Sequence, residues 1–134
     1  MPIGTRTKIL ATIGPSSATK EKLAELIDAG ADALFIDAAT GHTSRVLHVI
    51  EKLRELGKPV VAGNVVTQDG ARDLISAGAS AIKVGVGPGS ICTTRIISGV
   101  GMPQFTAIQE VAKVARPAGV TVIADGGIRY SGDA

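Results

Sequence analysis

Aromatic residues are scarce in this sequence: they make up 2% of its 134 residues, and tryptophan is absent. Aliphatic side chains must therefore fill the core, which favours a βα architecture with many small helix–sheet contacts. Hydrophobic residues account for 45% of the chain and charged residues for 19%. This balance predicts a folded domain rather than a disordered chain.

The sequence also has a small net charge and a single cysteine. The net charge is only +2 and no basic run occurs, so nothing indicates a nucleic-acid partner. The single cysteine, Cys92, excludes an internal disulfide and fits a reducing, cytoplasmic setting. No apolar run approaches the roughly 18 residues of a membrane span, and the first residues do not form a signal peptide, so no membrane partner is expected.

Two kinds of segment alternate along the chain. Short apolar runs predict five buried parallel strands: Lys8–Ile13, Ala33–Ile36, Val60–Ala62, Ala81–Val84 and Val120–Ala124. Between them, four stretches with apolar residues at helical spacing predict four helices. The apolar faces of these helices are Leu23, Leu26 and Ile27; Val46, Ile50 and Leu53; Ala71, Leu74 and Ile75; and Ile108, Val111, Ala112 and Ala115.

Helix boundaries are marked by glycines and by hydroxyl side chains. Four glycines stand where a helix is expected to end before the next strand: Gly30, Gly57, Gly78 and Gly119. The hydroxyl of Ser17 or Thr19 can cap the first helix, and that of Thr43 or Ser44 the second.

The βα units repeat. Leu26–Leu34 returns 48 residues later as Leu74–Ile82, which equals two units of strand, helix and loops. A closed eight-stranded barrel usually takes about 250 residues. Five parallel strands and four helices therefore predict one partial (βα) TIM-barrel domain over residues 1–134, completed by oligomerisation. An open doubly wound, flavodoxin-like sheet is the alternative.

Polar residues gather where the predicted strands end, which is where ligands bind in βα folds. They are Thr12, Asp37, Asn64, Lys83 and Asp125. The alternative is that such residues only meet water and cap helices. His42 and His48 show no metal-binding pattern. His48 is expected at the surface, and His42 either solvated or functional.

A long glycine-rich loop, Gly85–Pro103, follows the fourth predicted strand and carries Cys92. Long ordered loops in compact domains are usually functional, and a thiol on a polar loop can ionise and attack an electrophile. A lone cysteine is nevertheless more often inert. Asp125 and the two glycines after it form a second candidate site, in which backbone N–H groups suit a phosphate and the carboxylate suits sugar hydroxyls.

The cysteine loop Gly85–Arg95 resembles that of the IMP dehydrogenase and GMP reductase family. Ile36–His42, Ala62–Thr67 and Ile123–Asp133 resemble neighbouring segments of that family in the same order, so the resemblance covers about residues 34–134. It implies an eight-stranded barrel. It also implies oxidation of IMP to XMP with NAD, through a covalent thioimidate on the cysteine that water hydrolyses.

Carried over residue by residue, the resemblance implies a nucleophile at Cys92, with Thr94 near the hydrolytic water. The residues implied to hold IMP are Ser90, Asp125, Gly126 and Gly127, with the phosphate at the two glycines and the ribose at Asp125. The NAD side would comprise Asp37, Asn64 and Gly85. Backbone carbonyls of Gly87, Gly89 and Cys92 would match the potassium site.

The chain departs from that family at several points. Thr40 stands where the family usually has histidine, and the second phosphate loop and mobile flap are missing from the sequence. Arg6–Ser16 and Glu21–Gly30 instead resemble the opening βα unit of pyruvate kinase. A chimera of residues 1–33 and 34–134 is therefore predicted. Pyruvate kinase chemistry is not expected, because that family's phosphate- and metal-binding motif is replaced here.

Three functions remain open at this point. The first is a chimeric or engineered partial barrel without turnover on its own, which the missing half favours. The second is a module that binds IMP or phosphate weakly. The third is NAD-dependent oxidation of IMP by a homodimer or larger assembly with composite sites.

Overall fold

The computed structural model describes residues 7–133. Arg6, where the pyruvate kinase-like segment begins, lies outside the described residues. The strands are β1 (Leu10–Thr12), β2 (Ala33–Asp37), β3 (Val60–Val65), β4 (Ala81–Val84) and β5 (Thr121–Ala124). The helices are α1 (Lys20–Asp28), α2 (Ser44–Arg54), α3 (Gln68–Ala77), α4 (Thr94–Ser98) and α5 (Gln104–Ala115). A 3₁₀ turn, Ser131–Asp133, follows β5.

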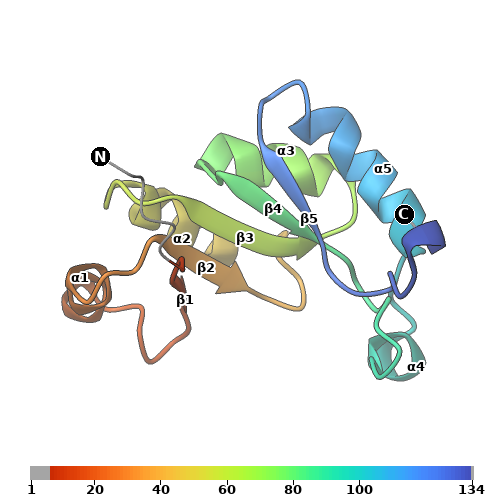
Figure 1. The fold of residues 1–134 in the computed structure, drawn as a ribbon, viewed down its shortest axis with the longest axis horizontal. Coiled ribbons are helices and arrows are strands. Elements are labelled where there is room, and N and C mark those ends of the chain that lie inside the picture. Colours follow the sequence, from red (N-terminus) through yellow and green to blue (C-terminus); the bar gives the residue numbers. More distant parts are fainter. Residues whose placement is uncertain (1–6, 134) are drawn as a thin grey trace.

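All five strands are parallel and lie in the sheet in the order in which they occur in the chain. Right-handed crossovers that always advance in one direction place their helices on one face. Figure 1 shows α2, α3 and α5 along the same side of the sheet. This order is that of a partial barrel and confirms the predicted fold class. The flavodoxin-like alternative requires a reversal of strand order, which the described sheet does not have.

One core lies between the sheet and these helices. Leu34, Ile82 and Val84 point into it from the strands, and Ile50 and Leu74 from the helices, all fully buried. Because side chains alternate along a strand, Phe35, Asp37 and Lys83 lie on the opposite face of the sheet. That second face has no helix layer among the described residues (Figure 1).

Helix ends follow the predicted chemistry. Thr19, Thr43 and Thr67 each accept a hydrogen bond from a backbone N–H in the first turn of α1, α2 and α3. Thr19 rather than Ser17, and Thr43 rather than Ser44, are thus the capping residues. The glycines predicted to end helices all have positive φ.

The prediction of four helices missed α4, a five-residue helix inside the cysteine loop. No side chain caps its N-terminus, and α4 buries no residue. It projects away from the sheet at the lower right of Figure 1. Within residues 7–133, no helix combines the length and apolarity that crossing a membrane would require.

Candidate functional site

A cleft of about 250 Å³ lies at the carboxyl ends of β3, β4 and β5. Its walls combine the loop after β4 with residues that follow the neighbouring strands. The lining residues are Ala39, Asn64, Gly85, Val86, Gly87, Pro88, Gly89, Cys92, Thr94, Asp125 and Gly126. The carboxyl edge of a parallel sheet is where βα folds bind ligands.

Cys92 and Thr94 face the same cleft. The Cys92 Sγ lies 3.3 Å from the Thr94 Oγ1, and the Cys92 backbone N–H donates to the Gly89 carbonyl at 3.1 Å. Hydrogen bonding to the Thr94 side chain, then to its backbone N–H, lowers the pKa of the Cys92 thiol, and the charge of Arg95 adds to this effect. A thiol with a lowered pKa holds more of the reactive thiolate at neutral pH.

Arg95 folds the cysteine loop back on itself. Its Nη2 donates to the Met102 carbonyl at 2.7 Å. A Cβ at Gly87 or Gly101 would lie 2.6 Å from the Arg95 Cγ, so the side chain runs between these two glycines. Only residues without a side chain allow the two ends of the loop to close on Arg95 this tightly.

Asp125, directly after β5, is held by two donors. The Lys83 Nζ lies 2.7 Å and the Asn64 Nδ2 lies 2.8 Å from the same carboxylate oxygen, Oδ2. The hydrogen bond from Lys83, followed by that from Asn64, lowers the pKa of Asp125. The carboxylate is therefore ionised and acts as an acceptor at neutral pH.

Gln104, at the start of α5, supports the same turn from behind. Its side chain is buried, and its Nε2 donates to the carbonyls of Val84 at 2.9 Å and Asp125 at 3.1 Å. A Cβ at Gly127 would lie 3.1 Å from the Gln104 Cβ. The ends of β4 and β5 are thus tied together beneath the cleft.

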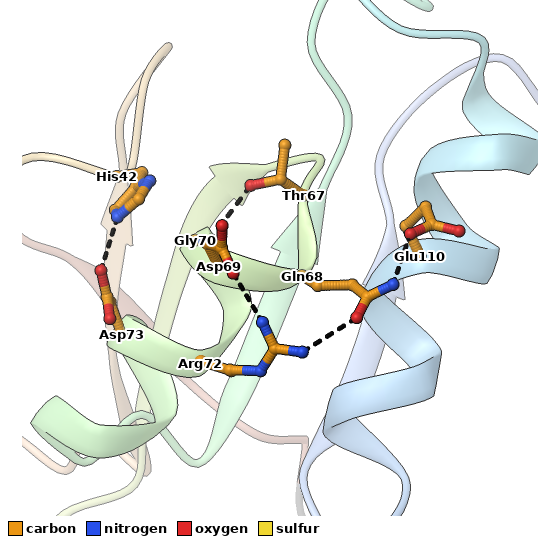
Figure 2. A network of polar contacts seen from close by, with 8 residues as sticks. All are labelled: His42, Thr67, Gln68, Asp69, Gly70, Arg72, Asp73 and Glu110. Carbon is orange, nitrogen blue, oxygen red and sulfur yellow. Dashed lines mark hydrogen bonds and ion pairs between the residues drawn. The ribbon is translucent and has the colours of Figure 1, made fainter.

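A second cleft of about 260 Å³ shares Asn64 with the first and lies beside the loop after β2. Its lining includes Thr40 and His42. The His42 Nε2 lies 2.6 Å from Asp73 Oδ2 on α3 (Figure 2). The His42 side chain is 42% exposed, so it contacts solvent as well as Asp73. In the described part of the chain, no group of three or more side chains is arranged to hold a metal ion.

The polar network in Figure 2 joins α3 to α5. The Gln68 Nε2 donates to Glu110 at 2.6 Å, and Arg72 binds both Gln68 and Asp69. Every one of these side chains has a partner within the network. The network thus links α3 and α5 at the surface, above the apolar core between them.

The structure gathers eight of the eleven predicted site residues at the first cleft: Asn64, Gly85, Gly87, Gly89, Cys92, Thr94, Asp125 and Gly126. Ser90 and Gly127 are both exposed, and neither lines the cleft. Asp37 joins the site only through Lys83, 2.9 Å away.

Sequence reasoning left two residues of the site without a role. Lys83 was noted only as a polar residue at a strand end, although a lysine in an otherwise apolar buried strand is a usable signal. Gln104 gave no signal, because a glutamine after proline at a helix start is ordinary.

Fold and cleft together define a βα-barrel type of domain that carries a thiol of lowered pKa at the carboxyl rim of its sheet. The family model of the IMP dehydrogenase / GMP reductase domain matches residues 4–134. The chain therefore belongs to the IMP dehydrogenase / GMP reductase domain family.

Several relatives share about half of the residues. The chain is 52% identical over 130 residues to the inosine-5'-monophosphate dehydrogenase of Aquifex aeolicus and to that of Streptococcus pyogenes. It is 53% identical over 129 residues to the Helicobacter pylori enzyme. Each match covers 96% of this chain but 26% of the relative, so the chain spans about a quarter of the length of these proteins.

Proposed function

We propose that the first cleft is part of a site for inosine 5'-monophosphate and that this chain binds the nucleotide without turning it over on its own. The observation that carries the proposal is the convergence of an activated thiol, Cys92, and an ionised carboxylate, Asp125, on one cleft of about 250 Å³. The name of the similar dehydrogenases supports the choice of nucleotide.

In this proposal Asp125 accepts hydrogen bonds from the ribose hydroxyls. The backbone N–H groups of Gly126 and Gly127 bind the phosphate, since both residues have positive φ and form a turn after β5. Ser90 joins them only if the exposed part of the loop turns inward. In an assembly that also holds NAD, the Cys92 thiolate would add to the purine while a hydride leaves the same carbon for NAD, and Thr94 would lie beside the water that hydrolyses the resulting thioimidate.

The residues proposed for the NAD side fit a ligand with amide donors. The Asn64 Oδ1 is buried without a hydrogen-bond partner, while its Nδ2 donates to the Gly85 carbonyl at 2.7 Å. Since a buried acceptor without a partner is costly, a donor from a ligand would stabilise it. Asp37, half exposed, completes the set. NAD, when bound, supplies the hydride acceptor.

The carbonyls of Gly87, Gly89 and Cys92 do not make a potassium site by themselves. Potassium sites are rings of several carbonyl oxygens, and this loop offers only the three named here. The cationic Arg95 side chain also lies directly against Gly87. We therefore propose this ion only for an assembly that adds further carbonyls.

Self-association is proposed from the open parts of the sheet. In the described residues β1 and β5 each pair on one side only, and Ile9 and Leu10 at the β1 edge are 51% and 57% exposed. Unpaired edges and uncovered apolar residues favour association. A homodimer would bring together ten strands, so it would close an eight-stranded barrel only if one strand of each chain stayed outside. Native mass by light scattering tests this, and a monomer at all concentrations would contradict it.

A chimeric origin is a further proposal, and it rests on the resemblance of Arg6–Ser16 to pyruvate kinase. The family match weighs against it, since that match begins at residue 4 and includes this unit. A chain whose first unit is replaced by that of the Aquifex aeolicus relative tests it. Equal folding stability of both chains would remove the case for a foreign unit.

Two measurements test the function. Calorimetry with IMP should give a weak binding isotherm for the chain that is lost in Asp125→Ala and retained in Asp133→Ala, an exposed aspartate beyond the site. Absorbance of NADH should not rise when IMP, NAD and potassium are added. Absence of binding would overturn the nucleotide site, and NADH formation that needs Cys92 would overturn the lack of turnover.

A further inference from the structure

Lys83 is a charged residue in a strand whose other members are buried and apolar. It is the third residue of β4, between Ile82 and Val84, and its side chain is only 12% exposed. Its ammonium lies 2.9 Å from Asp37 Oδ1 and 2.7 Å from Asp125 Oδ2. One cation therefore joins the carboxylate at the end of β2 to the carboxylate that directly follows β5.

Asp37 is within reach of Lys83 because the residue between them is glycine. In the sheet register Asp37 aligns with Gly63 on β3, and Gly63 aligns with Lys83 on β4. A Cβ at Gly63 would lie 2.7 Å from the Lys83 Cβ and 2.5 Å from its carbonyl oxygen. Any side chain there would fill the path along which the lysine crosses β3.

The ammonium stays charged in this place. Burial lowers the pKa of Lys83, but hydrogen bonds and charge attraction from Asp125 and Asp37 outweigh it, so the net pKa is raised. The ring of Phe35, with its centroid 5.7 Å from the Nζ, adds a cation–π contact. Burial between two carboxylates also fixes the direction in which the side chain points.

Lys83 and Asn64 both bind the Oδ2 of Asp125. The other oxygen, Oδ1, belongs to a side chain that is 44% exposed and lines the first cleft. The two donors therefore restrict the rotation of the carboxylate, and Oδ1 accepts no hydrogen bond from another described side chain. Without the lysine, two like charges would face each other across Gly63.

We infer that Lys83 is a positioning residue: it clamps Asp37 and Asp125 together, so that Asp125 presents its Oδ1 to the sugar hydroxyls of a bound nucleotide. The identity of that nucleotide rests on the proposed function, whereas the clamp itself does not. Lys83 does not line the cleft and acts through Asp125.

The first arm of the test needs no ligand. Carbon-13 NMR of the Asp125 carboxyl group follows its titration in the unaltered chain, Lys83→Met, Lys83→Arg and the control Lys22→Met, whose lysine pairs with Glu25 on the exposed face of α1. Lys83→Met should move the Asp125 titration to higher pH, Lys83→Arg should restore it, and the control should leave it unchanged. An unmoved titration in Lys83→Met overturns the inference.

Should Lys83→Met fail to fold, Asp37→Asn gives the same information, because Asp37 is half exposed. In Asp37→Asn the Lys83 ammonium has Asp125 as its one remaining carboxylate partner, so the Asp125 titration should move to lower pH. No movement would show that the two carboxylates are not joined through the lysine, and would overturn the inference.

The second arm compares IMP with its 2',3'-dideoxy analogue by NMR titration. The unaltered chain should prefer IMP, and Lys83→Met should reduce this preference by roughly tenfold, the loss of one charged hydrogen bond. The phosphate is the same in both nucleotides, so its attraction to the lysine cancels in the ratio. If Lys83→Met prefers IMP over the analogue as strongly as the unaltered chain does, the inference is overturned while the nucleotide site stands. If neither nucleotide binds the unaltered chain, the proposed function fails and the titration arm alone decides the role of Lys83.

Discussion

Gly85 at the end of β4 lies so close to Asp125 that Gly85→Ala should destabilise the chain by two separate effects. Its φ is +142°, a backbone conformation that costs a residue with a side chain about 1–3 kcal/mol. A Cβ there would also lie 2.6 Å from the Asp125 carbonyl oxygen, which belongs to the backbone and cannot rotate away. Overpacking of this kind costs about 1–3 kcal/mol, so the sum is about 4 kcal/mol.

Two glycines of the same chain separate these effects. Gly119 has a φ of +69°, and a Cβ added there would meet no atom within 4 Å, so Gly119→Ala carries strain alone, about 1 kcal/mol. Gly14 has neither a positive φ nor a close neighbour, so Gly14→Ala should change the free energy of unfolding by less than about 0.5 kcal/mol.

Urea unfolding followed by circular dichroism measures all three variants. With a slope of about 2 kcal/mol per molar urea, Gly85→Ala should lower the midpoint by about 2 M and Gly119→Ala by about 0.5 M. If Gly85→Ala were no more destabilising than Gly119→Ala, the end of β4 would not be packed beneath Asp125 and the geometry of the cleft would be wrong.

Three further predictions concern the thiol, the carboxylate and the core. Thr94→Val should raise the pKa of Cys92 and slow its alkylation by iodoacetamide at neutral pH. Thr93→Val, which replaces a neighbouring exposed threonine, should change neither. Equal alkylation rates in the two variants would contradict the contact between Thr94 and Cys92. The pKa of Asp125 is lower in the folded chain than its ordinary value of 3.8, so the ionised carboxylate stabilises the fold at pH values above 3.8. This stabilisation is lost as the pH falls through the lower pKa of the folded state. The difference in unfolding free energy between the unaltered chain and Asp125→Asn should therefore shrink in acid, and a difference independent of pH would contradict the ion pair. Leu74→Ala, in the fully buried core, should cost about 3 kcal/mol by thermal unfolding, and a cost below about 1 kcal/mol would mean that α3 does not pack as described.

The sequence was sufficient to predict the βα units because each is specified locally. Apolar runs define the strands, and Thr19, Thr43, Gly57 and Gly78 mark helix ends within a few residues of the pattern itself. The predicted strands agree with the observed ones to within two or three residues at each end. Helix α4 escaped prediction because it is short, uncapped and without a buried face.

The site could be predicted only where its residues follow strands or belong to the cysteine loop. The clamp at Lys83 depends on the register of three strands, which places Gly63 between Lys83 and Asp37. No local sequence pattern predicts the register between strands that lie far apart along the chain. The same holds for Gln104, whose two acceptors lie 20 and 21 residues away along the chain.

The most direct test of the account is a nitrogen-15 NMR map of the backbone amides during addition of IMP. We predict shifts that saturate together and are concentrated in Gly85–Cys92 and in Asp125–Gly127, with no comparable change in the apolar groove between α1 and α2. Saturating shifts confined to that groove, or no shifts at millimolar IMP, would contradict the claim that this chain carries part of a nucleotide site.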